Sequence, residues 1–319
     1  MIRFGIAGFG LHAAQNLAVG FRLAKNSRLT ALTRRNIDAA RASAAECRIP
    51  NAFDSIDEMC KSPDVDAVVV TTPNAFHRCD VLAALRAGKP VLCEKPMGLN
   101  ALECREMIAT AAEKNLTLGV AQVFRFEESA IALREKLSAG AIGQLRLARA
   151  EFLYPAAKSA RSWIADPQIA GGGPICDVGV HCIDTLRFVL NDEVAHVSAL
   201  AQGDHNSGGV ESTAILSLQF RRGALAEVLV SMRAPYRRTL ELVGEQGNLF
   251  SSDDPAQDAA RPSFKRFLPY ARMLDAFSSA IERREPFSIP GEEGLQNKLV
   301  LDAAYRSVRT GRTESLEAS

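Results

Sequence analysis

Three side chains capable of acid–base and electrostatic chemistry stand out because of the residues around them. Lys95 lies between Glu94 and Pro96, directly after a short apolar run that is typical of a buried strand. Asp177 and His181 follow a triple glycine and are four residues apart, so a helix would place both on one face. A lysine ammonium stabilises negative charge on a developing oxyanion, and an imidazole can give or take a proton near neutral pH. Together these groups could act on the oxygen of a carbinol or carbonyl carbon.

A glycine-rich turn between the first strand-like run and the first helical segment indicates a dinucleotide site. The turn has a G-x-G-x-x-A pattern and consists of Gly8, Phe9, Gly10, Leu11, His12 and Ala13. The first glycine of such a pattern permits a tight turn, and the second lets the main chain approach a pyrophosphate at the helix N-terminus. A plain glycine-rich turn is the alternative, but the position at the first strand–helix junction favours the dinucleotide.

The end of the second strand-like run indicates which dinucleotide is preferred. Sites selective for NAD carry Asp or Glu about 20 residues after the glycines, where this chain carries Arg34 and Arg35. Guanidinium groups suit the 2′-phosphate of NADP because they make bidentate contacts with phosphate. The alternative is that both arginines are solvated residues that begin the next helix. We therefore expect NADP(H) in preference to NAD(H).

Strand and helix signals alternate over the first 120 residues, which is typical of a doubly wound parallel sheet. Strands are expected at residues 2–7, 29–32, 67–71, 90–93 and 116–120, and helices at 11–24, 37–47, 55–61, 75–87 and 101–114. Ligands bind at the carboxyl ends of the strands in such sheets. Two polar segments follow strands there, Glu94-Lys95 and the group Thr72, Pro73, Asn74 and His77.

The pattern changes after about residue 125, where closely spaced strands replace the alternation. Helices are expected at residues 127–139, 174–190, 270–283 and 291–310, and strands at 145–154, 194–202, 212–220, 224–232 and 239–243. Strands joined by short connections must be antiparallel, because parallel crossovers need about a dozen residues. We expect an α/β protein: a Rossmann domain at residues 1–122, and an α+β domain at 123–319 with a large, mainly antiparallel open sheet. A C-terminal helix could pack back on the first domain.

Composition and charge narrow the classes of partner. The chain has 38 Lys and Arg against 37 Asp and Glu, so no excess charge favours nucleic acid or an anionic membrane. No apolar run approaches the length of about 18 residues that a membrane helix needs, and no secretory signal is expected before the first strand. The seven cysteines are an odd number without a C-x-x-C pair. They favour a reducing cytoplasm and offer no metal site.

Taken together, these motifs resemble the glucose–fructose oxidoreductase, inositol dehydrogenase and rhizopine-catabolism (Gfo/Idh/MocA) family. The resemblance covers nearly the whole chain, through the glycine loop, T-P-N-x-x-H, E-K-P, Arg125-Phe126 and G-G-G-x-x-x-D-x-G-x-H-x-x-D. It implies a Rossmann domain followed by an α/β domain with a large, mainly antiparallel sheet. It also implies sugar-like or polyol substrates, and homodimers or homotetramers that form through that sheet.

The resemblance assigns roles to single residues. Lys95 matches the catalytic lysine, Asp177 and His181 match the acid and the histidine of the active-site helix, and Trp163 matches an aromatic residue that borders the sugar pocket. The residues expected to bind the cofactor are Gly8, Phe9, Gly10, Leu11, His12, Arg34, Arg35, Thr72, Pro73, Asn74, His77, Glu94 and Lys95. Those expected to bind the substrate are Lys95, Gln122, Arg125, Trp163, Asp177 and His181.

Two departures from the family pattern leave the sugar unspecified. Ile164 stands where relatives often carry Arg, and residues 122–124 differ from the common His-Asn-Tyr type. The expected function is hydride transfer between NADP(H) and a CH–OH or C=O group, in either direction, with Asp177 balanced by Lys95 or His181. A non-catalytic NADP-binding sensor on the same fold and an NAD-dependent glycoside-cleaving enzyme are the alternatives. The intact set of Lys95, Asp177 and His181 favours an enzyme.

Overall fold

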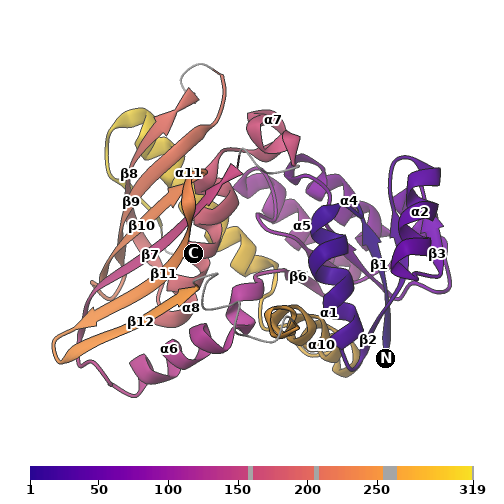
Figure 1. Ribbon diagram of the computed structural model, residues 1–319, viewed down its shortest axis with the longest axis horizontal. Coiled ribbons are helices and arrows are strands. Elements are labelled where there is room, and N and C mark those ends of the chain that lie inside the picture. The colour runs from indigo at the N-terminus through magenta and orange to yellow at the C-terminus, as the bar shows by residue number, and fades with distance from the viewer. Residues whose placement is uncertain (157–160, 205–207, 254–263, 318–319) are drawn as a thin grey trace. The chain divides into compact units, whose positions relative to one another are not determined.

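The computed structural model describes residues 1–156, 161–204, 208–253 and 264–317, and the chain divides into two units (Figure 1). The first unit comprises residues 1–123 and 264–295, and the second comprises residues 124–263 and 296–319. Helix α11, Gly291–Thr310, begins in the first unit and ends in the second. Among the described residues, every helix is too short or too polar to cross a bilayer.

The first unit contains a parallel sheet of six strands in the order β3-β2-β1-β4-β5-β6. Its strands are β1 Ile2–Ala7, β2 Ser27–Thr33, β3 Asn51–Phe53, β4 Ala67–Val70, β5 Val91–Cys93 and β6 Leu118–Val120. Strand β4 is buried throughout, which explains its continuous run of alanine and valine. The doubly wound sheet is thus confirmed, with β3 as an edge strand that was not predicted.

Polar side chains cap the N-termini of several helices in this unit. The helices are α1 Ala18–Leu23, α2 Ile37–Cys47, α3 Ile56–Lys61, α4 Asn74–Arg86, α5 Ala101–Lys114 and α10 Leu268–Arg283. The side chains of Asn36, Ser55 and Asn100 accept hydrogen bonds from main-chain N–H groups at the starts of α2, α3 and α5. Helices α4 and α5 pack together, as do α1 and α10 (Figure 1).

Helix α10 belongs to the Rossmann unit although it follows the second sheet in sequence. Its Asp275 carboxylate accepts hydrogen bonds of 2.8 to 3.0 Å from the main-chain nitrogens of Lys25 and Asn26, in the connection between α1 and β2. Ser27 donates to the same carboxylate at 3.1 Å. These bonds attach α10 at the amino end of β2.

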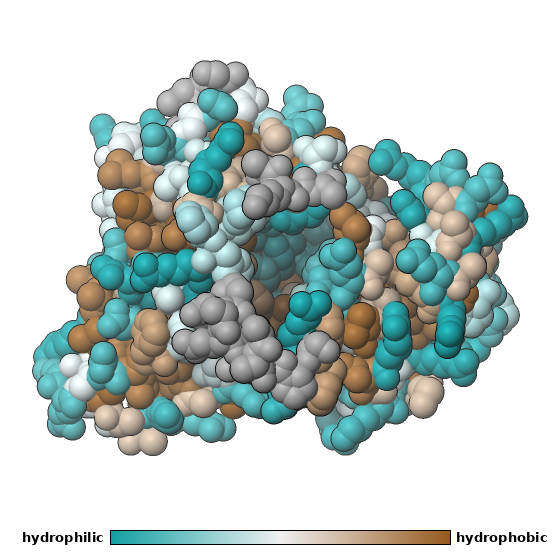
Figure 2. Space-filling model, in the orientation of Figure 1, coloured by the Kyte–Doolittle hydropathy of each residue, from teal (hydrophilic) through white to brown (hydrophobic). Residues whose placement is uncertain are grey.

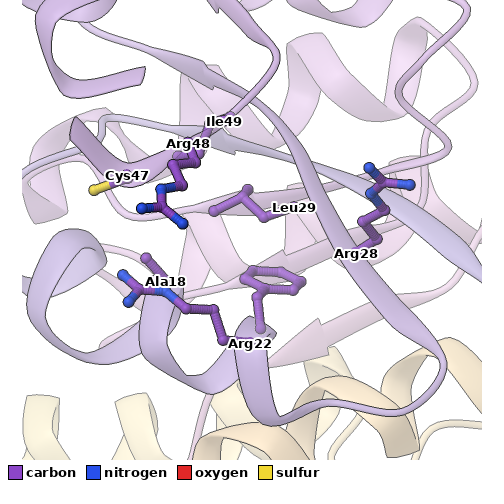
Figure 3. A pocket seen from close by; sticks show the side chains of 8 residues that line it. Ala18, Arg22, Arg28, Leu29, Cys47, Arg48 and Ile49 are labelled. Atoms are coloured by element: carbon purple, nitrogen blue, oxygen red, sulfur yellow. The ribbon is translucent and has the colours of Figure 1, made fainter. Parts of the chain in front are cut away.

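A cavity lies at the amino edge of this sheet, opposite the edge that carries the glycine loop (Figure 3). Its lining residues come from α1, from the end of α2 and the two residues after it, and from the start of β2, and they are Ala18, Phe21, Arg22, Arg28, Leu29, Cys47, Arg48 and Ile49. Arg22 lies in the last turn of α1, and Arg48 is the C-terminal cap of α2. Cations at these positions interact favourably with the helix dipoles, so Arg22 and Arg48 have a structural explanation.

The second unit contains a seven-stranded sheet in the order β12-β11-β7-β10-β9-β8-β13. Its strands are β7 Leu145–Pro155, β8 Val194–Gly203, β9 Glu211–Phe220, β10 Leu225–Ser231, β11 Arg233–Gly244, β12 Gly247–Asp253 and β13 Glu314–Ser315. Strands β7 and β10 are parallel, and the other strand pairs that the structure describes in this sheet are antiparallel. The large, mainly antiparallel sheet is therefore confirmed, while the edge strands β12 and β13 were not predicted.

The two faces of the second sheet differ in their surroundings. Helices α6, Glu128–Ser138, and α8, Val180–Leu190, cover one face together with part of α11 (Figure 1). Residues along β9 alternate between buried and more exposed, as expected for a strand with one face in the core. The other face carries exposed apolar side chains, namely Leu147, Leu200, Ile215, Leu225 and Phe250. Figure 2 shows hydrophobic residues exposed among hydrophilic ones over the region of these strands.

Two helices next to predicted site residues have a π-helical turn near their start. Ala13–Leu17 follows the glycine loop and leads into α1, and Ile175–Gly179 leads into α8. The expected helices at 11–24 and 174–190 are thus irregular at their starts. Such turns are rare in proteins, and those that occur are often found at functional sites. Because a π-turn holds more than four residues, Asp177 and His181 still lie on one side of their helix.

Candidate active site

The glycine loop has the open main chain that a pyrophosphate requires. Gly8 has a φ of +81°, and a Cβ there would lie 2.5 Å from Cγ2 of Thr72, so the turn itself needs glycine. A Cβ on Gly10 would meet only the Gly8 carbonyl oxygen, at 3.9 Å. No packing contact among the described residues therefore explains glycine at position 10. A phosphate group that approaches the main chain does explain it, so the loop fits a dinucleotide.

Glu94, at the carboxyl end of β5, is joined to the glycine loop by His12. Its Oε1 lies 2.9 Å from Nε2 of His12, and its Oε2 accepts a hydrogen bond from the main-chain nitrogen of Lys95 at 3.1 Å. Burial raises the pKa of Glu94, but His12 and Lys95 outweigh this effect and hold the pKa below its usual value. Glu94 is therefore ionised at neutral pH beside the predicted catalytic lysine.

His77 connects two segments of the carboxyl edge through their main chains. Its Nδ1 lies 2.9 Å from the carbonyl oxygen of Pro96, and its Nε2 lies 2.8 Å from that of Thr72. The ring is fully buried, and burial lowers its pKa despite the two carbonyl groups. These contacts are those of a residue that orients the Lys95-Pro96 segment, and direct contact with the cofactor stays a prediction.

Arg34 and Arg35 are exposed directly after the carboxyl end of β2. The Nη1 of Arg34 donates a hydrogen bond of 2.8 Å to the Ser43 hydroxyl on α2. Asn36 caps α2 and accepts from the main-chain nitrogen of Ala39. Both arginines therefore follow β2 at the carboxyl edge of the sheet, where a Rossmann unit holds the adenosine ribose.

Gln122 has a buried carboxamide that finds no hydrogen-bond partner among the described residues. It follows β6 and is 1% exposed, and neither its Nε2 nor its Oε1 has a hydrogen-bond partner among the described residues. The main-chain nitrogen of Ala121 donates to Cys93, so Gln122 lies at the ends of β5 and β6. Leaving a buried carboxamide unpaired costs about 1–3 kcal/mol, which a polar ligand or water would recover.

In the second unit, Asp177 is held by two groups that the sequence patterns did not indicate. The Tyr154 hydroxyl donates to Oδ2 at 2.5 Å, and Arg161 donates to Oδ1 at 3.2 Å and to Oδ2 at 3.0 Å. Burial raises the pKa of Tyr154 and Asp177 raises it further, so the phenol keeps its proton. Within its unit, Asp177 is therefore balanced by Arg161, a partner that the sequence interpretation did not include.

The ring of His181 packs against aromatic side chains of the second unit. Its ring stacks on Phe124 with centroids 4.3 Å apart and an interplanar angle of 26°, and Phe152 lies 6.1 Å away. The guanidinium of Arg238 lies 4.0 Å from the centre of the Phe124 ring and pairs with Glu127 and Asp253. A cation, a phenyl ring and an imidazole thus form one stack.

Trp163 lies in the short turn Ser162–Ala165, close to the partners of Asp177. The Arg161 guanidinium is 5.9 Å from the centre of its indole ring. Ile164, in the position where relatives often carry Arg, is buried. The structure therefore brings Trp163, Asp177 and Arg161 together within the second unit.

Arg125, which is expected to bind substrate, forms a buried ion pair with Asp184. Its Nε and Nη2 donate to the two carboxylate oxygens of Asp184 at 2.9 and 2.7 Å, and the side chains are 9% and 1% exposed. Asn297 of α11 donates to the same carboxylate at 2.7 Å, and Arg187 donates to Asn297 at 2.8 Å. These contacts join α8, α11 and the segment before α6, so the geometry gives Arg125 a structural role, and contact with substrate stays a prediction.

Packing explains Gly172 and Gly173 of the triple glycine. A Cβ on Gly172 would lie 1.8 Å from the Tyr305 hydroxyl, and one on Gly173 would lie 2.0 Å from the carbonyl oxygen of Glu211. The Glu211 carboxylate accepts hydrogen bonds from the main-chain nitrogens of Gly173 and Ile175 and from Tyr305. A buried carboxylate therefore caps the start of the helix that carries Asp177, and only glycine fits beside it.

The two units together define a class of protein. One unit offers a phosphate-binding glycine loop with an ionised carboxylate and a lysine at the end of β5, and the other offers an aspartate and a buried histidine on one helix. These are the components of a nicotinamide-dependent oxidoreductase.

Comparisons with known proteins agree. Residues 2–122 match the model of the oxidoreductase family with an NAD-binding Rossmann fold, and residues 130–250 match that of the Gfo/Idh/MocA C-terminal domain. The 1,5-anhydro-D-fructose reductase of Ensifer adhaerens is 32% identical, with 99% of each chain covered. The chain belongs to the Gfo/Idh/MocA family of NAD(P)-dependent dehydrogenases and reductases, which confirms the resemblance.

Two further relatives show the range of the family. The trans-1,2-dihydrobenzene-1,2-diol dehydrogenase of Mus musculus is 35% identical over 77% of this chain and 73% of its own length. The crystal structure of the aldose–aldose oxidoreductase of Caulobacter crescentus, complexed with glycerol, has a TM-score of 0.87 and 26% identity, with 99% of each chain covered. The Caulobacter crescentus structure therefore shares the fold over its full length, while the names of the three relatives give different substrates.

Proposed function

We propose that the protein transfers a hydride between NADP(H) and a CH–OH or C=O group of a sugar or polyol. The observation that carries the proposal is the second-unit cluster, in which His181 is stacked on Phe124 and Asp177 is held by Tyr154 and Arg161. A full-length relative that is named a reductase of an anhydrosugar supports the class of substrate.

The roles of the side chains follow from their chemistry. When bound, the nicotinamide supplies or accepts the hydride. Lys95 stabilises the negative charge that develops on the substrate oxygen, and His181 gives or takes the proton at that oxygen. Asp177, ionised against Arg161, accepts a hydrogen bond from a neighbouring substrate hydroxyl.

A substrate screen tests this proposal. Aldoses, ketoses, dicarbonyl sugars and inositols are each offered with NADPH or NADP⁺, and with NADH or NAD⁺, while absorbance at 340 nm is followed. We expect turnover with at least one sugar or polyol. Tight cofactor binding without turnover would instead support a sensor, and cleavage of a chromogenic glycoside would support the glycoside-cleaving alternative.

The proposed preference for NADP(H) rests on Arg34 and Arg35, exposed at the end of β2. Replacing both with Ala is expected to weaken NADPH binding by about 1.5–3 kcal/mol for each charged hydrogen bond removed, and NADH binding far less. Fluorescence titration with both cofactors measures this. Arg28→Ala, at the opposite edge of the same sheet, is the matched control. Equal decreases in affinity for the two cofactors, or a wild type that prefers NADH, would contradict the preference.

We also propose that the protein forms a homodimer or homotetramer through the open face of the second sheet. Leu147 and Leu225 are neighbours on adjacent strands and are 42% and 51% exposed, so they contribute to an apolar patch. Light scattering is expected to give a dimer or tetramer for the wild type and a smaller species for Leu147→Glu/Leu225→Glu. Leu102→Glu, on an exposed residue of α5, should leave the mass unchanged. A wild-type monomer at micromolar concentration would reject the interface.

A cytoplasmic location is the last part of the proposal. All seven cysteines are free thiols, and five of them are buried, namely Cys60, Cys93, Cys104, Cys176 and Cys182. Buried free thiols persist in a reducing compartment. Fractionation of cells that produce the protein tests this.

A further inference from the structure

His12 has neighbours that can satisfy it in either charge state. Its Nε2 faces Glu94 at 2.9 Å, and its Nδ1 lies 3.2 Å from the side-chain amide of Asn16. An asparagine amide can present N–H to a neutral imidazole or, after rotation, oxygen to an imidazolium. Tyr270 of α10 contacts the ring, with centroids 5.9 Å apart. The site can therefore hold His12 neutral or charged without losing a hydrogen bond.

Glu94, the partner of His12, lies on the nicotinamide side of the predicted cofactor site. In a sheet of order 3-2-1-4-5-6, the dinucleotide crosses the edge where the strand order reverses, between β1 and β4. The arginines after β2 mark the adenosine side, so β4 and β5 lie on the other side. Glu94 directly follows β5 and is buried. A nicotinamide bound on this side would have this carboxylate near the ring that changes charge.

We infer that the charge on His12 sets the relative affinity for the oxidised and reduced cofactors. The oxidised nicotinamide ring carries a positive charge that the reduced ring lacks. When His12 is neutral, the Glu94 carboxylate can stabilise that charge. When His12 is an imidazolium, the pair is neutral and the advantage of the oxidised form disappears. This inference rests on the proposed function only in that the Rossmann unit must bind the dinucleotide.

Several other titratable groups face this pair. The main-chain nitrogen of Lys95 donates to Glu94, and the positive charge of Lys95 helps to lower the pKa of Glu94. Burial lowers the pKa of His77, whose ring nitrogens face the carbonyl oxygens of Pro96 and Thr72, and burial raises the pKa of the Cys93 thiol. Burial also raises the pKa of Asp80, which accepts a hydrogen bond from the Thr72 hydroxyl. Variants of His12 are therefore needed to assign a pH dependence to His12 itself.

The sign of the pH dependence follows from this linkage. Binding of the oxidised cofactor favours neutral His12, so it releases a proton at acidic pH. The ratio of Kd for NADP⁺ to Kd for NADPH should therefore fall as the pH rises from about 5.5 to about 8.5. The expected fall is at least about tenfold, because one unit charge within about 12 Å changes an affinity by about tenfold or more at an effective dielectric of about 20. The 2′-phosphate also titrates in this range, but it is common to both cofactors and cancels in the ratio.

Equilibrium titrations with NADP⁺ and NADPH at a series of pH values test the inference without substrate. His12→Gln should give a flat ratio at the low value, and His12→Lys should give a flat ratio at the high value. The control His196→Gln, on β8 of the second unit, should behave as the wild type. Calorimetry in buffers of different ionisation enthalpy should show a proton released when NADP⁺ binds to the wild type.

The outcomes separate this inference from the proposed function. A wild-type ratio that does not change with pH, or an unchanged slope in both His12 variants, would overturn the role of His12. If both cofactors still bind in that case, the proposed function stands. If neither cofactor binds to the wild type, the dinucleotide site itself is wrong.

Discussion

Replacing His181 with Asn is expected to lower kcat by about 10²- to 10⁴-fold on the substrate that the screen identifies. Asparagine keeps a polar, planar group against Phe124 but cannot exchange a proton near neutral pH. The affinity for NADPH should change little, because the glycine loop and the arginines after β2 lie in the first unit. In a plot of kcat against pH, the variant should lose the part of the pH dependence that the His181 imidazole contributes.

A double variant of His181 and Lys95 tests whether the two side chains act on the same substrate oxygen. Lys95→Met is expected to lower kcat by about 10²- to 10³-fold, the usual cost of removing one group that stabilises an oxyanion. Residues that act on the same oxygen lose their effects together, so the double variant should be little worse than the more damaging single variant. Multiplied decreases in kcat would show that the two side chains act in separate steps. Turnover like the wild type in His181→Asn would reject its role outright.

The sequence predicts elements well where local patterns determine them. The expected helices at 37–47 and 291–310 coincide with α2 and α11, and the continuous apolar run 67–70 is the buried strand β4. Strand β12 was missed because its residues are polar or exposed and lie at the sheet edge, where burial imposes no hydrophobic pattern. Edge strands carry little of the periodic signal on which such predictions rest.

The same distinction applies to the candidate site. Residue spacing within one segment identified the glycine loop and placed Asp177 and His181 on one helix, as the structure has them. The partners of those residues were missed because they are distant in sequence: Tyr154 is 23 residues from Asp177, and Phe124 lies on a different element from His181. Sequence periodicity indicates which residues share one face of a helix or strand, but it does not indicate which residues of different elements are in contact.

Asp184 and Asp177 have different surroundings in the structure, and the local sequence pattern does not distinguish them. It shares a motif and a helix with Asp177, yet it is 1% exposed and binds Arg125 and Asn297, whereas Asp177 faces Tyr154 and Arg161. Arg187, also buried, lies 4.0 Å from Asp184 and is bound to Glu193 through two hydrogen bonds. One acid therefore joins elements inside the unit, while a ligand contact of the other stays a prediction.

Replacing Asp184 with Asn is expected to destabilise the second unit by about 3–5 kcal/mol, because it removes the charge of a buried carboxylate that pairs with the buried Arg125. Differential scanning fluorimetry should show the corresponding transition about 10 °C lower, at roughly 2–4 °C per kcal/mol for a unit of this size. Glu245→Gln removes an exposed partner of Arg146 in the same unit and should cost less than about 1 kcal/mol. An Asp184→Asn protein as stable as the wild type would mean that Arg125 has another counter-charge, and would return that arginine to the residues available for substrate.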